Sequence, residues 1–191
     1  MLFRSERRTG LVTRYGRIAV AAAGLFVSAC AATEEALQKS QGHYQEGVAT
    51  LSGDRQKAFV SFQKAVQLNP KNKEARYGLG HVYALQGKLA QAEEEFRSAI
   101  QIDDAYSEAH TYLGQVLASQ GKWEEAMESF EDAVLANPAS VPPALTHLEL
   151  GRVYSKLGYA AKAREVLGKV KALDKSGQYT DAATELLARL K

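Results

Sequence analysis

The feature that most constrains this chain is a repeat with a period of 34 residues. Glycines recur at Gly53, Gly87, Gly121 and Gly158, which are 34, 34 and 37 residues apart. Three further sets of residues keep these intervals: Ala58, Ala92, Ala126 and Ala163; Phe62, Phe96, Phe130 and Leu167; Ala65, Ala99, Ala133 and Val170. A fixed period of this length is typical of stacked units that each contact only their neighbours. The sequence therefore predicts a repeat array.

Each unit predicts two antiparallel helices. Apolar residues follow a helical period, Gly87 and Gly121 stand where a first helix must stop, and Pro70 and Pro138 follow the second helices. No strand-like alternation follows Cys30. The expected helices are 36–51, 54–67, 73–86, 89–102, 107–120, 123–136, 144–157, 160–173 and a last one at 178–190. The predicted fold class is all-α.

The residue types at these positions resemble the tetratricopeptide repeat. The second unit matches best, with Leu79-Gly80, Tyr83, Gly87, Ala92 and Phe96 at the family's spacing. The resemblance implies a superhelix of helix-turn-helix units, with about four repeats over residues 39–175 and a C-terminal capping helix in residues 176–191. In that last helix, one side collects the apolar residues Ala182, Ala183, Leu186, Leu187 and Leu190.

Small residues inside the helices predict close packing. Glycine inside a helix costs about 1 kcal/mol relative to alanine, so its recurrence at one register indicates a contact that compensates for this cost. We expect Gly80 and Ala92 to provide that contact by letting two helix backbones approach each other. Phe96 and Phe130 are expected to fill the space toward the next repeat. The Gly78-x-Gly80 pair lies inside a predicted helix with no preceding strand, so it predicts packing and not a phosphate loop.

Two irregularities interrupt the repeat. The first unit is one residue short between Gly47 and Gly53, as terminal repeats often are. The segment NPASVPPALTHLELG adds three residues before the fourth unit, with Pro142-Pro143 where a helix can begin. One interpretation of the insertion is a slightly longer connection between two repeats. The other is that a proline-bearing insertion before a Leu-Gly repeat resembles the tetratricopeptide lipoproteins of type IV pilus biogenesis, the PilF, PilW and Tgl group.

The N-terminus predicts a secretory signal. Five arginines and one glutamate lie in residues 1–17, and residues 18–29 carry no charge. Twelve residues are too few for a membrane-spanning helix, which needs about 20. Val27-Ser28-Ala29-Cys30 resembles a bacterial lipobox, which implies a lipoprotein signal peptide at 1–29 and a lipid (palmitate-type) anchor on Cys30. Residues 30–38 are then the lipidated N-terminus and the start of the first helix, which begins near Thr33 with very little tether. A plain signal peptide and an uncleaved anchor are the alternatives.

Ala31 and the remaining charge bear on location and partners. By resemblance to lipoproteins, Ala31 favours the outer membrane, with the protein on its periplasmic face. Without residues 1–29, which hold five of the 24 basic and one of the 22 acidic residues, the formal net charge is −2. No basic run remains, so nucleic acid is not an expected partner.

The sequence predicts no catalytic chemistry. The histidines, His43, His81, His110 and His147, are not spaced as metal ligands, and no nucleophile has a partner that could orient it. Glu93-Glu94-Glu95 and Glu124-Glu125 are expected on solvated helix faces. We expect no enzyme, no metal site, no cofactor and no small-molecule substrate.

The resemblance places a partner-binding groove on the first helices of the repeats. Carried over position by position, the groove residues are Tyr44, Val48, Glu74, Tyr77, His81, Thr111, Gln115 and Arg152, with Ala84, Glu108, Ala118, Leu145, Leu148 and Ser155 beside them. Family members that clamp a C-terminal carboxylate have Lys and Asn at the positions that Tyr77 and His81 hold here. The sequence therefore predicts a different kind of peptide partner.

Together these features predict a non-enzymatic, lipid-anchored scaffold for protein–protein interaction in the bacterial envelope. The most specific hypothesis is type IV pilus biogenesis, with a pilus secretin as the partner. The alternatives are an adaptor for peptidoglycan enzymes or another envelope complex, and a purely structural array that associates with itself.

Overall fold

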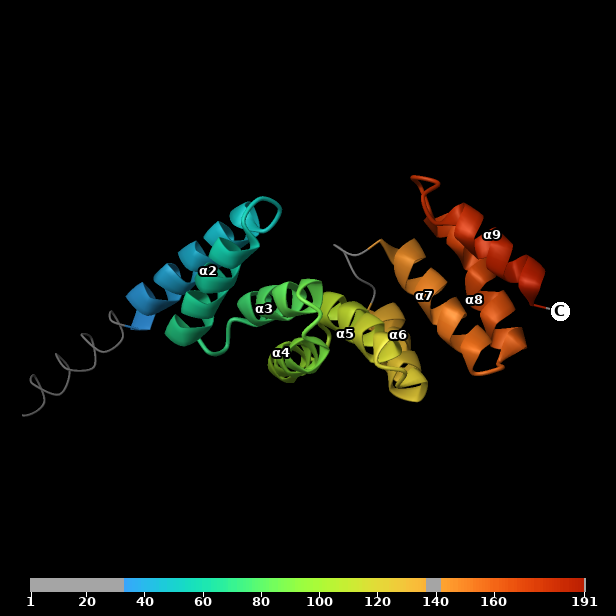
Figure 1. Cartoon of the computed structure of the whole chain (residues 1–191), viewed down its shortest axis with the longest axis horizontal. Helices are drawn as coiled ribbons and strands as arrows, with labels where there is room; N and C mark the ends of the chain where they lie inside the picture. The colour runs from blue at the N-terminus through green and yellow to red at the C-terminus, as the bar shows by residue number, and fades with distance from the viewer. Residues whose placement is uncertain (1–32, 137–141, 191) are drawn as a thin grey trace, which may run out of the picture.

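The computed structural model describes residues 33–136 and 142–190, and every regular element in these ranges is a helix. The helices form hairpins that follow one another along an elongated stack (Figure 1). Residues 33–50 are helical. They are followed by α2 (Arg55–Leu68), α3 (Lys73–Leu85), α4 (Leu89–Ile102), α5 (Ser107–Ser119), α6 (Trp123–Ala136), α7 (Pro143–Lys156), α8 (Ala160–Leu173) and α9 (Thr180–Arg189).

The predicted all-α repeat fold is confirmed. Most helices match their expected bounds to within one or two residues. The first is already helical at residue 33, and α9 is shorter than expected at both ends. Pro142 caps α7 and Pro143 is its first residue, as expected for prolines that lack a helical hydrogen-bond donor. The predicted signal peptide, Cys30 and Pro138 lie outside the described residues.

Glycines end the first helices, as predicted. Gly87 and Gly121 have φ values of +74° and +80°, a region that side chains with a Cβ rarely adopt. After α3, the N–H of Lys88 donates to the carbonyl of Tyr83 at 2.9 Å, and the N–H of Gly87 donates to that of Ala84 at 3.0 Å. This pair of hydrogen bonds is the Schellman motif.

The helical glycines make room for large side chains of the second helices. A methyl group on Gly80 would lie 2.8 Å from Cε1 of Phe96, and one on Gly114 would lie 2.9 Å from ring atoms of Phe130. The group nearest to Gly80 is therefore the Phe96 ring, a contact that the expected approach of two backbones did not include. The same arrangement recurs at Gly47 with Phe62 and at Gly151 with Leu167, while Gly78 also contacts Phe62.

These side chains form the buried core, which is divided into three clusters along the described residues. The residues equivalent to Phe96 and its alanine neighbours are at most 1% exposed in all four repeats. The apolar side of α9 then covers the last hairpin, packing Leu186, Leu187 and Leu190 against Leu148 and Leu167. This confirms the predicted orientation of the last helix, which closes the exposed end of the stack.

We expect Gly114→Ala to destabilise the protein, because the added methyl group collides with the Phe130 ring. Overpacking of a well-packed core costs about 1–3 kcal/mol. Chemical denaturation followed by far-UV circular dichroism measures the loss. The control is Gly168→Ala on α8, where a methyl group meets nothing within 4 Å. This control should be stabilised by about 0.5–1 kcal/mol through helix propensity alone. Equal effects of the two changes would contradict the ring-in-gap packing.

The turn between α8 and α9 depends on Asp174. Its carboxylate accepts hydrogen bonds from the backbone N–H groups of Tyr179 and Thr180, at 2.7 and 2.9 Å, and from the Thr180 hydroxyl at 2.9 Å. Desolvation alone would raise the pKa of Asp174. The hydrogen bonds from Tyr179, Ser176 and Thr180 outweigh it and hold that pKa well below its usual range.

A depressed carboxylate pKa contributes stability above its unfolded value of about 4 and loses it as the pH falls toward the folded value. We therefore expect Asp174→Asn to lower the melting temperature at pH 7, and the difference from the unchanged protein to shrink at pH 2. Thermal melts at both pH values measure this difference. An equal difference at the two pH values would rule out the carboxylate as its source.

Candidate partner-binding face

Aromatic side chains from α3, α4, α5 and the residue before α5 gather in the second and third repeats. The Tyr77 ring centroid lies 5.8 Å from that of Phe96, 5.7 Å from Tyr106 and 5.5 Å from Tyr112. His81 stacks on Tyr77 at 6.3 Å and meets Tyr112 edge-on at 5.3 Å. We call these five residues the ring cluster. Its edge-to-face geometry is the arrangement that aromatic pairs prefer.

Local structure explains how the ring cluster forms. Tyr77 and His81 are four residues apart on α3, so they share a face of the helix. Tyr112 comes from α5, and Tyr106 is the residue that precedes α5. Burial raises the pKa of Tyr77 and of Tyr106 and lowers the pKa of His81. Burial therefore favours the neutral forms of these side chains.

Two carboxylates lie beside this cluster. Glu74 and Glu108 are the second residues of α3 and α5, at equivalent repeat positions. After burial, their charges are the main contributions that raise the pKa values of Tyr44 and Tyr106. Tyr44 comes from the first repeat, so residues of three successive repeats meet here. We call Tyr44, Glu74, Glu108 and the ring cluster the first-helix face.

Lys73, which lies beside these carboxylates, already has interaction partners. Lys73 forms an ion pair with Asp103, and its Nζ lies 5.0 Å above the Tyr106 ring. It also approaches the Glu74 carboxylate at 4.0 Å. Within the described ranges, Glu108 has no cation within 4 Å. The first-helix face is therefore aromatic and acidic.

The predicted groove residues do not all reach the surface. Thr111 is fully buried, and its hydroxyl lies 3.3 Å from that of Thr146 on α7. The prediction that Thr111 lies on the groove surface is therefore wrong. Its short side chain is buried in the contact between two first helices, α5 and α7. Leu148 is likewise buried, at 3% exposure.

The remaining predicted residues differ in their surroundings. Tyr44, Glu74, Tyr77 and His81 belong to the first-helix face, and Gln115 is half-buried on α5. Val48 is exposed. Arg152 is exposed and pairs with Glu149 on its own helix at 3.1 Å. Sequence reasoning missed Tyr106 and Tyr112, although four tyrosines between residues 77 and 112 were a signal for an aromatic cluster.

The other histidines have structural contacts. His110 is buried, with Nε2 2.9 Å from the carbonyl oxygen of Asp104, and Nδ1 of His147 lies 2.9 Å from the carbonyl oxygen of Pro143. Over residues 33–136 and 142–190, no group of three His, Cys, Asp or Glu side chains could hold a metal ion. Within the same ranges, no helix is long and apolar enough to cross a membrane.

The glutamates of α4 are less solvated than expected. Glu95 pairs with Arg76 at 3.0 Å, and Glu93 pairs with Arg97 at 3.0 Å and with Lys122 at 2.9 Å. Two of these ion pairs, Glu95 with Arg76 and Glu93 with Lys122, connect neighbouring segments of the array, so they belong to the packing of the repeats.

Solved structures share this fold. PilF of Pseudomonas aeruginosa matches with a TM-score of 0.70 and 24% identity, over 83% of this chain and 68% of that one. TTC0263, a tetratricopeptide protein of Thermus thermophilus, gives a TM-score of 0.65 and 26% identity over 79% and 82%. The first such domain of Spaghetti (RPAP3), bound to the HSP90 peptide SRMEEVD, gives 0.59 and 21% over 64% and 95%.

Sequence comparison reaches the same family. No curated protein matches this chain. One tetratricopeptide repeat family model matches residues 49–99 and 83–145, and a second matches residues 144–183. Because the first model alone covers half of the chain, and the helix pairs repeat at the expected spacing, the chain belongs to the tetratricopeptide repeat family.

Proposed function

We propose that this chain is a non-enzymatic scaffold that holds a protein partner on its first-helix face. The observation that carries this proposal is the ring cluster, whose tyrosines are half-buried beside two carboxylates. Tyrosine offers a rigid apolar ring and a polar hydroxyl, so it is enriched where proteins bind each other. Arrays of this family present such surfaces to protein partners.

The charge of the face specifies the partner segment. Glu74 and Glu108 favour a segment that carries lysine or arginine, since a cation can pair with a carboxylate and lie over a tyrosine ring. An acidic segment such as SRMEEVD, which the RPAP3 domain binds, would be repelled here. This agrees with the absence of Lys and Asn at the positions that Tyr77 and His81 occupy.

The finer proposal is a lipid anchor on Cys30 that holds the array at the periplasmic face of the outer membrane, where it supports assembly of a type IV pilus secretin. The lipobox-like segment at residues 27–30 supports the anchor. The fold shared with PilF and the insertion before the fourth repeat support the pilus role. Anchoring would also raise the local concentration of the scaffold around partners in the same membrane.

Lipid attachment is tested by metabolic labelling with palmitate. We expect the protein to incorporate label and Cys30→Ala to incorporate none, because the chain has a single cysteine. Cys30→Ser is a second variant that keeps a small polar side chain, and it should also lack label. Undiminished labelling of either variant would remove the anchor from the proposal.

The partner role is tested by charge reversal on the first-helix face. Tyr77→Ala would remove a ring packed on four others, so the double variant Glu74→Lys/Glu108→Lys is the cleaner change. In a strain that lacks the gene, it should fail to restore secretin multimers on a gel that preserves them. The matched control, Glu94→Lys/Glu124→Lys, reverses two exposed charges on second helices and should restore multimers.

Circular dichroism of both double variants shows whether the fold is kept. Normal multimers and twitching in the deletion strain would remove the pilus role while leaving the scaffold proposal open to other partners. Full activity of a folded Glu74→Lys/Glu108→Lys variant would move the partner site away from the first-helix face.

A further inference from the structure

The most exposed large apolar side chain of the described residues lies near the end of α6. Leu135 is 82% exposed, whereas the other exposed apolar side chains of this size are 37% to 51% exposed. It shares one side of α6 with Glu124, Glu128 and Asp132, which precede it at helical spacing and are also exposed. α6 carries five acidic and no basic residues. The stack therefore leaves a leucine in solvent on an acidic helix surface.

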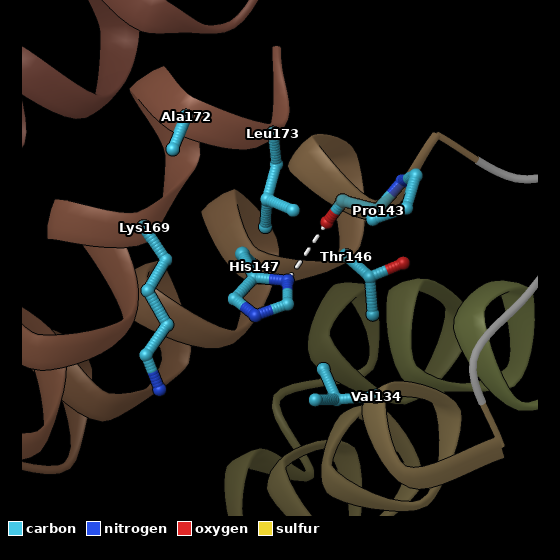
Figure 2. Close-up of a pocket in the computed structure, with 7 residues that line it drawn as sticks. All are labelled: Val134, Pro143, Thr146, His147, Lys169, Ala172 and Leu173. Carbon is cyan, nitrogen blue, oxygen red and sulfur yellow. Dashed lines mark hydrogen bonds between the residues drawn. The ribbon is translucent and has the colours of Figure 1, made fainter.

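An apolar pocket opens beside this leucine. It has a volume of about 290 Å³ and lies between α6, α7 and α8. Val134, which precedes Leu135, lines one side of the pocket, and Leu173 of α8 lines another. Figure 2 shows the His147 ring near the centre of the pocket, with Lys169 at one side. The pocket is larger than a leucine side chain, and most of its lining is apolar.

The neighbouring second helix, α8, carries the opposite charge. It has four basic residues and one acidic residue. The four bases, Lys162, Arg164, Lys169 and Lys171, are all exposed. The acid, Glu165, already pairs with Lys169 on its own helix at 2.9 Å. The exposed surfaces of α6 and α8 are therefore complementary in charge, one acidic and the other basic.

The repeat places the matching groups in register. Leu135 and Ala172 hold equivalent positions on α6 and α8, 37 residues apart, and so do Asp132 and Lys169. When α6 of one copy lies parallel to α8 of another, Leu135 reaches the pocket at Ala172, and Asp132 reaches Lys169 one turn earlier. Gly168 and Ala172 have little or no side chain, so a second helix can approach this part of α8 closely.

We propose that this chain forms a symmetric dimer, in which Leu135 of each copy occupies the pocket of the other and Asp132 pairs with Lys169 across the interface. A twofold axis that runs between α6 and α8, along the helices, brings α6 of each copy onto α8 of the other. One operation therefore fills both pockets. The Lys169 ammonium has three N–H donors and gives one to Glu165, so it can also donate to a carboxylate of the second copy.

The apolar contact supplies affinity, and the charges supply register. Removing an exposed leucine from water favours association, and symmetry makes each contact count twice. Ion pairs at the rim steer the encounter and fix the orientation of the two copies. The interface goes beyond the proposed function, because it shares no residue with the first-helix face. The dimer carries two such faces, which strengthens binding to a partner that offers repeated segments.

Sedimentation velocity over a series of concentrations tests the dimer. The sample is the full chain with Cys30→Ala, which removes the single cysteine and so prevents lipid attachment and disulfide-linked dimers. We expect an equilibrium of monomer and dimer, which Leu135→Ala weakens at least tenfold. The control Leu85→Ala shortens another exposed leucine, at the end of α3, and should leave the equilibrium unchanged. A chain that stays monomeric throughout the series, or equal effects of the two changes, would overturn the proposal.

Charge swaps assign the interface. Asp132→Lys brings two cations together in each contact and Lys169→Glu brings two anions together, so each variant alone should dimerise about tenfold more weakly. A mixture of the two should form heterodimers as tight as the original dimer, because each contact again joins an anion to a cation. The control Glu94→Lys changes an exposed acid on α4 and should dimerise normally. Circular dichroism shows that each variant is folded. A mixture that stays as weak as its components would overturn the pairing.

Cysteine pairs test the register of the helices. In the Cys30→Ala background, a copy with Leu135→Cys and a differently tagged copy with Ala172→Cys should form a mixed disulfide. Ala161→Cys is the control, since it lies eleven residues earlier on α8, about 16 Å along the helix, and should form none. Equal crosslinking at both positions would overturn the register. Loss of the dimer in Glu74→Lys/Glu108→Lys would place the interface on the first-helix face and overturn the proposal.

Discussion

The insertion of one large side chain into the space left by a missing Cβ organises this molecule. Phe62, Phe96, Phe130 and Leu167 each lie against a helical glycine of their own repeat, at distances that a methyl group could not share. Each contact fixes the two helices of a hairpin against each other. Phe62 also contacts Gly78 of the next repeat, which shows how the same ring can join neighbouring hairpins. The regular order of the stack depends on this repeated contact.

Most of the fold was predictable because the same residue pattern recurs in four successive units of the sequence. Four copies of the same glycine and alanine spacing, with phenylalanine in three of them and Leu167 in the fourth, fix the helices and their stops. The details of contact were less predictable. A glycine inside a helix signals close approach, but the spacing alone does not say whether a backbone or a ring approaches. At Gly80 the approaching group is the Phe96 ring.

The candidate site was predictable only in part, for two physical reasons. Thr111 and Tyr77 occupy the same repeat position, yet the short side chain is buried against Thr146 while the long ring reaches the half-exposed cluster. Position in a repeat therefore fixes direction but not depth. Tyr106 lies between helices, where no helical period applies, so its place beside Tyr77 comes from how two hairpins pack.

The series of Arg76, His110 and His147 shows that one repeat position can change its charge while the stack keeps its order. Each side chain lies on the first helix of its hairpin, and Arg76 and His110 each meet an acid on the second helix of the same hairpin, at 3.0 and 3.8 Å. In the last hairpin, Lys169 stands at the repeat position that Asp132 holds in the hairpin before it. The large side chains and glycines that order the stack occupy other positions. Such an array can therefore change the charge of one hairpin at a time by single substitutions.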